Sequence, residues 1–270
     1  MKKICTVFLC FSTAAAFAQN VKLETGKKIT AVTTATMEMD MGMGGQMKIS
    51  SVSTGVISII GTDDKMYKGE NTLTKMKISQ DGAGQTNSYD SENPADRNSE
   101  MGKQAGSMLN LPGAILIDKT DGTVKDANPE KALAGGNPME DLMGASKSPS
   151  ATAAAAFFVL PEGKKAGDKW TDSTSEAGIK VIKYFELQSV KDGIATVLLE
   201  ALTKGSIEKE AESMQMTITI NGITKSTILS DLNTGLVKSN TSNGNIEGTL
   251  DMMGQSMPIT MTINSVTRFE

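Results

Sequence analysis

The sequence predicts a mainly β protein of the β-rich α+β class, with antiparallel strands in two meander-like halves and a short helical segment between them. Runs rich in Thr, Val, Ile and Met recur in both halves, and Gly- and Asp-containing turn signals separate them. Many of these runs alternate with a period of two, which is typical of strands. Between the halves lies a stretch rich in Ala, Pro and Gly, which favours short helices and loops.

Residues 1–18 are typical of a secretory signal peptide. Lys2 and Lys3 form a charged start, an apolar run follows, and Ala16-Phe17-Ala18 supplies the small residues that a signal peptidase requires. We therefore expect an exported protein, periplasmic or extracellular, whose mature chain begins at Gln19. The apolar run is shorter than the roughly 20 residues that cross a bilayer, so we expect no stable membrane span.

The N-terminal antiparallel half is assigned to residues 19–125. A meander of four strands is expected from Lys28 to Ser88, because apolar alternation is interrupted there by three turn signals, Gly44-Gly45, Asp63-Asp64 and Asp81-Gly82. The stretch from Arg97 to Leu111 favours a helix, and Pro112-Gly113 ends it. A short hairpin is expected around Asp121-Gly122.

Residues 126–166 are assigned to a helical connecting segment, and the alanine-rich run from Ala151 to Leu160 predicts a helix within it. Residues 167–270 form the C-terminal antiparallel half. Here Asn221-Gly222 predicts a tight hairpin, and Asn243-Gly244 predicts a turn. The two halves form either two sheets or one continuous curved sheet, and both arrangements are compatible with the sequence.

Methionines cluster in a hairpin near the start of the mature chain. Side chains at every second position of a strand share one face. Four methionines occupy such positions: Met37, Met39, Met41 and Met43. Glu38 and Asp40 lie between them and share the other face. A reduced copy of this stretch runs from Leu250 to Met257. We therefore expect strands with one apolar, sulfur-rich face and one face in water.

The register of both hairpins is expected to place apolar side chains opposite one another, because a slip of one residue would exchange the two faces. A three-residue loop that ends at Gln46 sets Met43 opposite Met47. In the late copy, the same apolar match sets Met252 opposite Met257.

Three functions are compatible with this methionine face. The first is a non-enzymatic extracytoplasmic protein that binds an apolar or lipid-like ligand, or a hydrophobic segment of an envelope protein, since methionine forms adaptable binding surfaces. Its candidate contact residues are Met37, Met39, Met41, Met43, Met47, Met252, Met257, Phe157 and Phe158. The second is a structural or interaction protein of the cell envelope with a closed methionine-rich core.

The third function is Cu(I) binding by methionine thioethers, which are soft ligands. Four methionines at alternate positions span about 20 Å of strand and cannot all converge on one ion. Two neighbours could do so together with Met47 or with a residue from another strand. We assign no metal-ligand residues and no cofactor.

Charge and composition argue against several other classes of protein. The net charge of −4 disfavours partners that bind to basic protein surfaces, so we expect no nucleic-acid partner. The sequence contains no histidine, and its two cysteines, Cys5 and Cys10, lie in the leader. The commonest general bases and nucleophiles are therefore missing from the mature chain. We expect no enzymatic activity and assign no catalytic residues.

Five short landmarks are distributed over most of the mature chain: Gly44-Gly45-Gln46-Met47, Tyr89-Asp90-Ser91, Gly167-Asp168-Lys169-Trp170, Thr234-Gly235-Leu236 and Met253-Gly254-Gln255-Ser256-Met257. In these landmarks the chain resembles a family of exported Gram-negative bacterial proteins known only as a domain of unknown function. The resemblance implies export and β-structure. It brings no substrate, activity or catalytic residue.

Overall fold

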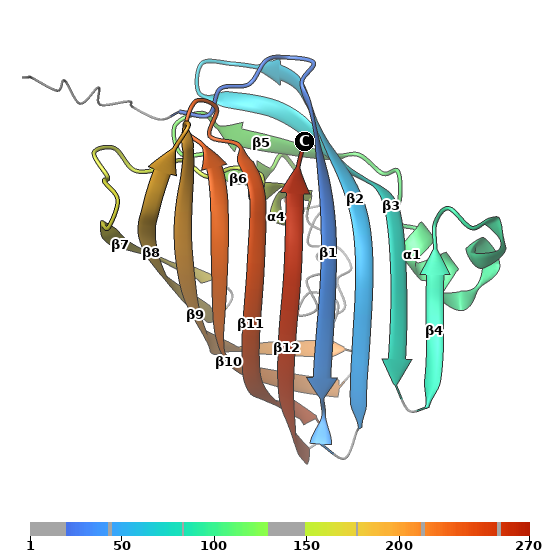
Figure 1. Cartoon of the computed structure of the whole chain (residues 1–270). Coiled ribbons are helices and arrows are strands. Elements are labelled where there is room, and N and C mark those ends of the chain that lie inside the picture. Colours follow the sequence, from blue (N-terminus) through green and yellow to red (C-terminus); the bar gives the residue numbers. More distant parts are fainter. Residues whose placement is uncertain are drawn as a thin grey trace, which may run out of the picture.

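The structure, a computed structural model, describes residues 20–42, 45–82, 84–128, 149–176, 178–211, 214–252 and 255–270. In this part of the chain, twelve strands form one open antiparallel sheet (Figure 1). The predicted mainly β class is confirmed. Of the two arrangements compatible with the sequence, the structure shows one continuous curved sheet.

The N-terminal half forms the expected meander and the expected hairpin. Its strands are β1 (Lys28–Asp40), β2 (Gln46–Thr62), β3 (Met66–Gly82), β4 (Gln85–Asp90), β5 (Gly113–Asp118) and β6 (Val124–Asp126). At the β2–β3 turn, the Asp63 carboxylate accepts hydrogen bonds from the backbone N–H groups of Met66 and Lys65, at 2.9 and 3.0 Å. These two hydrogen bonds lower the pKa of Asp63.

The C-terminal half contributes the other six strands. They are β7 (Lys169–Glu176), β8 (Ile179–Lys191), β9 (Ile194–Ala211), β10 (Met214–Asp231), β11 (Val237–Met252) and β12 (Gln255–Phe269). The strand order is β6-β5-β3-β2-β1-β12-β11-β10-β9-β8-β7, with β4 beside β3. Figure 1 shows β1 in blue and β12 in red side by side, so the first and last strands join the two halves.

The helices are shorter than the sequence predicted. They are η2 (Pro94–Asn98), α1 (Glu100–Gly106) and α4 (Pro149–Ala154). The predicted helix from Arg97 to Leu111 narrows to α1, which Ser99 caps by accepting a hydrogen bond from Gly102 N. After α1, Asn110 adopts a positive φ of 57° and its backbone N–H bonds Leu73 O, which is incompatible with a continuing helix.

The predicted helix from Ala151 to Leu160 ends early because its second part bonds to the β10–β11 turn. Phe158 N donates to Gly235 O at 3.0 Å, and Val237 N donates to Ala156 O at 2.9 Å. These hydrogen bonds extend the chain after α4 and attach it to the sheet. Helical segments expected between residues 129 and 148 lie outside the described residues.

Both Asn-Gly turn predictions are wrong, because Asn221-Gly222 and Asn243-Gly244 lie inside β10 and β11. Each of these two strands is paired on both sides, and the pairing overrides the local turn preference. The glycines instead leave room for neighbouring side chains. A Cβ at Gly222 would lie 2.9 Å from Ile246 Cγ1, and one at Gly244 would lie 2.9 Å from Thr224 Oγ1.

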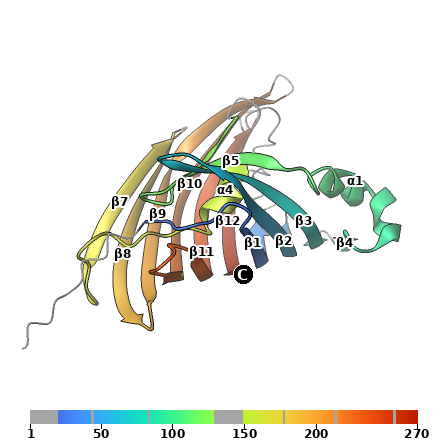
Figure 2. The same cartoon turned by 90° about the horizontal axis from the view of Figure 1, so that it is seen from above.

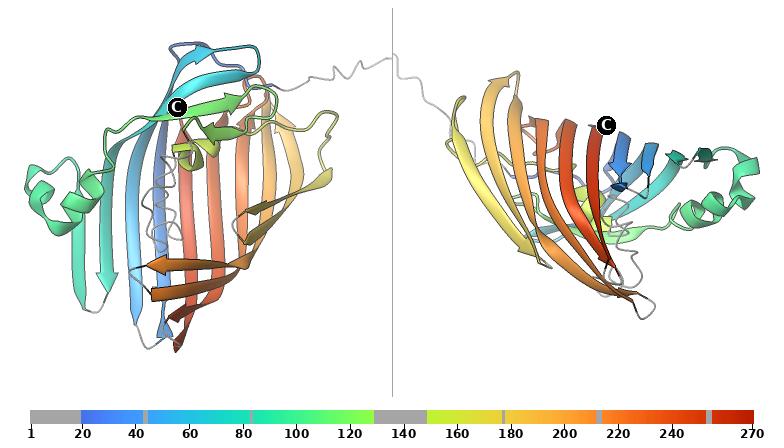
Figure 3. Two further views of the ribbon diagram at one scale, coloured as in Figure 1. Left: turned by 180° about the vertical axis from the view of Figure 1, so that it is seen from behind. Right: turned by 90° about the horizontal axis from the view of Figure 1, so that it is seen from below.

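The sheet is strongly curved, and α4, β5 and β6 lie on its concave side (Figures 2 and 3). Figure 3 also shows the parts of β9 and β10 around residues 205–220 crossing the concave side near the lower end. Glycine permits this bend. A Cβ at Gly205 or Gly248 would lie only 2.1 Å from the backbone oxygen of Gly178 or Thr219.

Two separate hydrophobic cores lie on the concave side. The α4 core includes Ala153 and Phe157 near α4 together with Ile29, Ile57, Ile115, Ile117, Leu187 and Val197 from the strands. The methionine core consists of Met37, Met39, Ile218, Ile220, Leu250, Ile259 and Met261. The cores lie at different levels of the same strands, because Ile29 and Met37 are both on β1.

The two methionine hairpins keep the predicted faces but not the predicted register. Met47 pairs with Met39 rather than with Met43, and Met252 pairs with Gln255 rather than with Met257. Both differences move the pairing by an even number of positions, which leaves the same side chains on the same face. Apolar matching therefore determined the face, and it left pairings that differ by an even number of residues equally acceptable.

Candidate functional site

The predicted contact residues divide between the two cores. Met37 and Met39 are buried in the methionine core, with exposed fractions of 8% and 3%. Three further methionines are half-buried and pack against it: Met41, Met47 and Met257. Phe157 is buried in the α4 core, and Phe158 packs against that core. Met43 lies outside the described residues, as does the side chain of Met252.

The strand register aligns three methionines in a row across the methionine core. Met39 on β1 is opposite Met261 on β12 and Met47 on β2. The Met47 sulfur accepts a hydrogen bond from Gln80 Nε2 at 2.9 Å. Among the described residues, no group of three His, Cys, Asp or Glu side chains could hold a metal ion. Met261 was not among the predicted contact residues, because its position beside Met39 depends on pairing between the first and last strands.

A band of small, polar side chains crosses the concave face between the two cores, and we call it the polar belt. One of its rows contains Ala35 and four serines, Ser51, Ser226, Ser242 and Ser265. The next row contains Thr33, Ser53, Asn240 and Thr267. Ser226 is buried, and the other belt residues are half-buried. These side chains occupy less volume than the Ile and Met side chains of the neighbouring core.

The hydroxyl groups of the belt bond to one another. Ser226 Oγ lies 3.0 Å from Ser242 Oγ, and Thr33 Oγ1 lies 2.9 Å from Thr267 Oγ1. Asn240 Oδ1 is the one buried side-chain polar atom, among the described residues, that has no hydrogen-bond partner. A buried acceptor without a donor is costly, so this atom is an unfavourable feature of the belt.

The belt row that contains Ser226 continues into aromatic and aliphatic residues at the β7–β8 edge. Ser226 is opposite Leu199, which is opposite Phe185. Phe185 stacks on Trp170, with ring centroids 5.2 Å apart and an interplanar angle of 6°. All three of these apolar side chains are half-buried. The row thus places aromatic side chains at one end and small side chains in the middle, all on the concave face.

The polar belt was not predicted from the sequence. Ser51 and Ser53 alternate on one face of β2, which was a usable signal for a polar stripe. That signal does not say which strands continue the stripe. The serines of β10, β11 and β12 join it only through the observed register.

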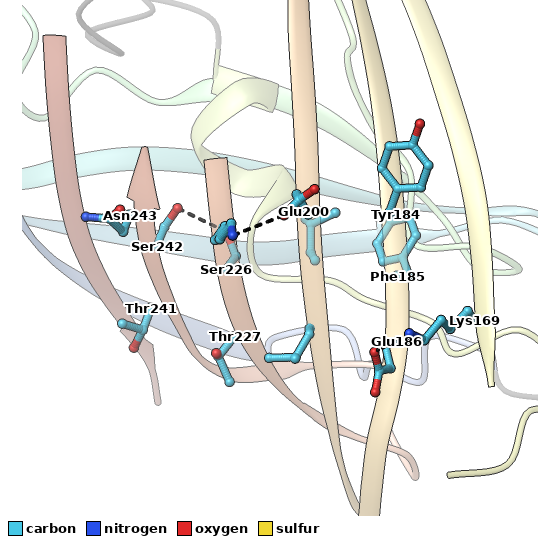
Figure 4. A pocket seen from close by; sticks show the side chains of 13 residues that line it. Lys169, Tyr184, Phe185, Glu186, Glu200, Ser226, Thr227, Thr241, Ser242 and Asn243 are labelled. Atoms are coloured by element: carbon cyan, nitrogen blue, oxygen red, sulfur yellow. Dashed lines mark hydrogen bonds and ion pairs between the residues drawn. The ribbon is translucent and has the colours of Figure 1, made fainter. Parts of the chain in front are cut away.

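A hollow of about 530 Å³ lies over β8–β11, and Figure 4 shows the residues around it. The charged side chains that line it lie at alternate positions on the convex face and pair with one another. Lys225 Nζ lies 3.3 Å from the Glu200 carboxylate, and Lys169 Nζ lies 3.1 Å from that of Glu186. Because these charges are matched locally, the hollow presents no unpaired charge to a ligand.

A second hollow, of about 550 Å³, lies over the methionine hairpin, and its charged lining residues include Glu38, Asp40, Lys48 and Asp81. Lys48 Nζ donates to Glu38 Oε1 at 2.8 Å, and this hydrogen bond, with the attraction between the two charges, raises the pKa of Lys48. The face opposite the methionines is therefore the wet, charged face that the sequence predicted.

The overall arrangement is similar to that of one large lipid-associated protein. A lipovitellin structure described for its lipid–protein interactions superimposes with a TM-score of 0.52 at 9% identity, over 92% of this chain and 25% of that chain. Our chain thus spans a quarter of the lipovitellin chain, and the likeness concerns the fold alone. None of the helices in the described segments is long and apolar enough to span a membrane.

An outer membrane channel from Pseudomonas putida F1 aligns over 93% of this chain and 97% of its own, with a TM-score of 0.27 and 7% identity. No curated protein sequence matches the chain. Residues 139–237 match the model of a "Family of unknown function (DUF6263)". Two of the five landmarks, Gly167-Asp168-Lys169-Trp170 and Thr234-Gly235-Leu236, lie in that range. The predicted resemblance to a family known only as a domain of unknown function is thereby confirmed.

Proposed function

We propose that this chain is an exported, non-enzymatic protein that binds an apolar, lipid-like molecule on the concave face of its sheet, along the polar belt between the two cores. The observation that carries the proposal is the belt row itself. It combines half-buried Phe185 and Leu199 with a floor of small side chains, such as Ser242 and Ser265. A hydrocarbon chain gains by covering such apolar surface, and small residues leave it space.

The proposed site differs from the methionine face that the sequence suggested. Met37 and Met39 pack against β10 and β12 residues of the methionine core and offer little surface to a guest. Met41, Met47 and Met257 remain half-buried at the margin of this core. The deep methionines therefore serve as core, and those at the margin are available to line one end of the site.

Three further observations support the proposal. The leader at residues 1–18 has the composition of an export signal, which fits a protein of the cell envelope. The fold is similar to that of lipovitellin, a protein described for its lipid–protein interactions. The absence of histidine, and the location of both cysteines in the leader, support a binding role rather than catalysis.

The test is to introduce a bulky side chain into the polar belt and to measure binding of a fluorescent C16 fatty-acid probe to the mature protein. Ser242→Phe places a large ring on the concave face, and we expect it to weaken binding at least about tenfold by occupying the chain's space. Thr241→Phe is the matched control, because Thr241 is the neighbouring β11 residue, exposed on the convex face. This control should bind as the wild type does.

Far-UV circular dichroism establishes that both variants fold. A flat titration with the wild type would refute the proposal, as would equal affinities for Ser242→Phe and Thr241→Phe. Native mass spectrometry of protein purified from the cell envelope without detergent gives an independent reading, with a bound molecule of lipid-like mass as the expected result.

A second candidate function is a structural or interaction protein of the cell envelope with no small ligand. The burial of Met37 and Met39 in a closed core favours it. It predicts flat titrations and a native mass spectrum without a bound lipid-like molecule, so the same two measurements separate the two functions.

A further inference from the structure

We infer that the molecule bound on the concave face is an anionic amphiphile whose negatively charged head group pairs with Lys183. This inference rests on the proposed function and names the chemical class of its ligand. The basis is the position of Lys183, a cation on the concave face that forms no hydrogen bond or ion pair with the described residues.

Lys183 belongs to the concave face by strand alternation. On β8 it lies between Val181 and Phe185 at alternate positions, and Phe185 packs against the α4 core. Lys183 is half-buried, whereas Lys180 on the convex face is exposed. Among the described side chains at concave positions of the sheet, that of Lys183 is the sole cation.

The surroundings of Lys183 leave its charge unpaired. Its cross-strand neighbours are Ala201 on β9 and Asp172 on β7. The Asp172 carboxylate instead accepts a hydrogen bond from the backbone N–H of Ser173, at 2.7 Å. Lys183 has no hydrogen bond or ion pair within the described structure. The Lys183 ammonium group is therefore available to an incoming anion, and such a charge-assisted hydrogen bond is stronger than a neutral one.

The residues that follow across the sheet suit the rest of such a ligand. From Lys183 the cross-strand row runs through Ala201, Thr224 and Gly244 to Ile263. Ile263 packs against the methionine core. Four strand spacings of roughly 4.8 Å give the row a length of about 19 Å, which is comparable to a long acyl chain. Along its length the row therefore presents a cation at one end, small side chains in the middle and an apolar side chain at the other end.

The test compares C16 compounds that differ only in the head group: palmitate, hexadecyl phosphate, hexadecanol and hexadecyltrimethylammonium. Competition against the fluorescent probe, below the micellar concentration of each compound, gives their affinities for the mature protein. We expect both anions to bind at least about tenfold more tightly than the alcohol, and the cation to bind more weakly than the alcohol. Added NaCl should reduce the preference for anions.

The variant Lys183→Met should bring the anions to the affinity of the alcohol and leave the alcohol itself unchanged. Lys180→Met, three residues before Lys183 on the same segment of β8 and exposed on the convex face, should keep the wild-type preference. Stronger binding of the phosphate than of palmitate would identify a phospholipid-like head group, and the reverse would identify a fatty acid. Either order supports the inference.

The outcomes separate the two proposals. If the wild type binds none of the four compounds, the proposed function fails, and the inference fails with it. If the wild type binds the alcohol as tightly as the anions, or if Lys183→Met keeps the preference for anions, the inference is overturned while the proposed function stands.

Discussion

Met39 links the sequence pattern to the packing of the methionine core. Its exposed fraction is 3%, and its cross-strand neighbours on β12 and β2 are Met261 and Met47. Thioether side chains are flexible and fill irregular space, which suits a core formed where the sheet folds over itself. The buried position of Met39 indicates a structural contribution that can be measured separately from ligand binding.

Met39→Ala is expected to lower the free energy of unfolding by about 2–5 kcal/mol, since it removes a buried side chain and leaves a cavity. Met39→Leu conserves volume and should cost less than about 1.5 kcal/mol. Thr260→Ala, at an exposed position on β12, serves as control and should change stability by less than about 0.5 kcal/mol. Urea denaturation followed by circular dichroism measures all three. A Met39→Ala variant as stable as the control would contradict burial of the methionine face.

The long strands depend on glycines where they bend. Gly205 and Gly248 both lie opposite Ile220 on β10, one on each side. At either position a Cβ would meet the backbone of an adjacent strand. This close approach explains why glycine stands in the interior of strands whose other residues favour β-structure.

Gly248→Ala should destabilise the protein by at least about 2 kcal/mol, because its Cβ would lie 2.1 Å from the backbone oxygen of Thr219 and the strands would have to separate. Gly55→Ala is the matched control, since the nearest atoms to a Cβ there are 3.8 Å away. We expect that variant to stay within about 1 kcal/mol of the wild type. Thermal unfolding distinguishes the two. Equal melting temperatures for both variants would show that the strands adapt to a side chain at Gly248.

At the scale of the whole molecule, pairing between the first and last strands joins the two halves in one sheet. The β1–β12 ladder runs from Ala31 opposite Phe269 to Asp40 opposite Thr260. Separate sheets would permit independent unfolding of the halves, whereas a continuous sheet couples them through this ladder.

Trp170, the one tryptophan of the chain, reports this coupling, because it lies on β7 at the opposite edge of the C-terminal half from β12. In urea, the transition followed by tryptophan fluorescence should coincide with that followed by circular dichroism. Met39→Ala in β1 should shift both midpoints equally. A fluorescence midpoint that stays at the wild-type value while circular dichroism shifts would show that the halves unfold independently.

Local alternation made the strand faces readable from the sequence. The N-terminal meander, the hairpin at Asp121-Gly122 and the apolar face of Met37 and Met39 all follow from periodicity and turn chemistry, which act within a few residues. The same local rules failed at Asn221-Gly222, because pairing with β9 and β11 stabilises a continuous strand there.

The sequence by itself determined the fold class, most strand positions and which residues share a face. Only the tertiary structure decided that β1 pairs with β12, that Met261 lies beside Met39, and that serines from separate strands form one belt that continues to Leu199 and Phe185. The physical reason is that alternation is a property of a single strand. The neighbours of a strand are chosen by contacts between residues far apart in the chain, and several pairings two residues apart satisfy the same alternation.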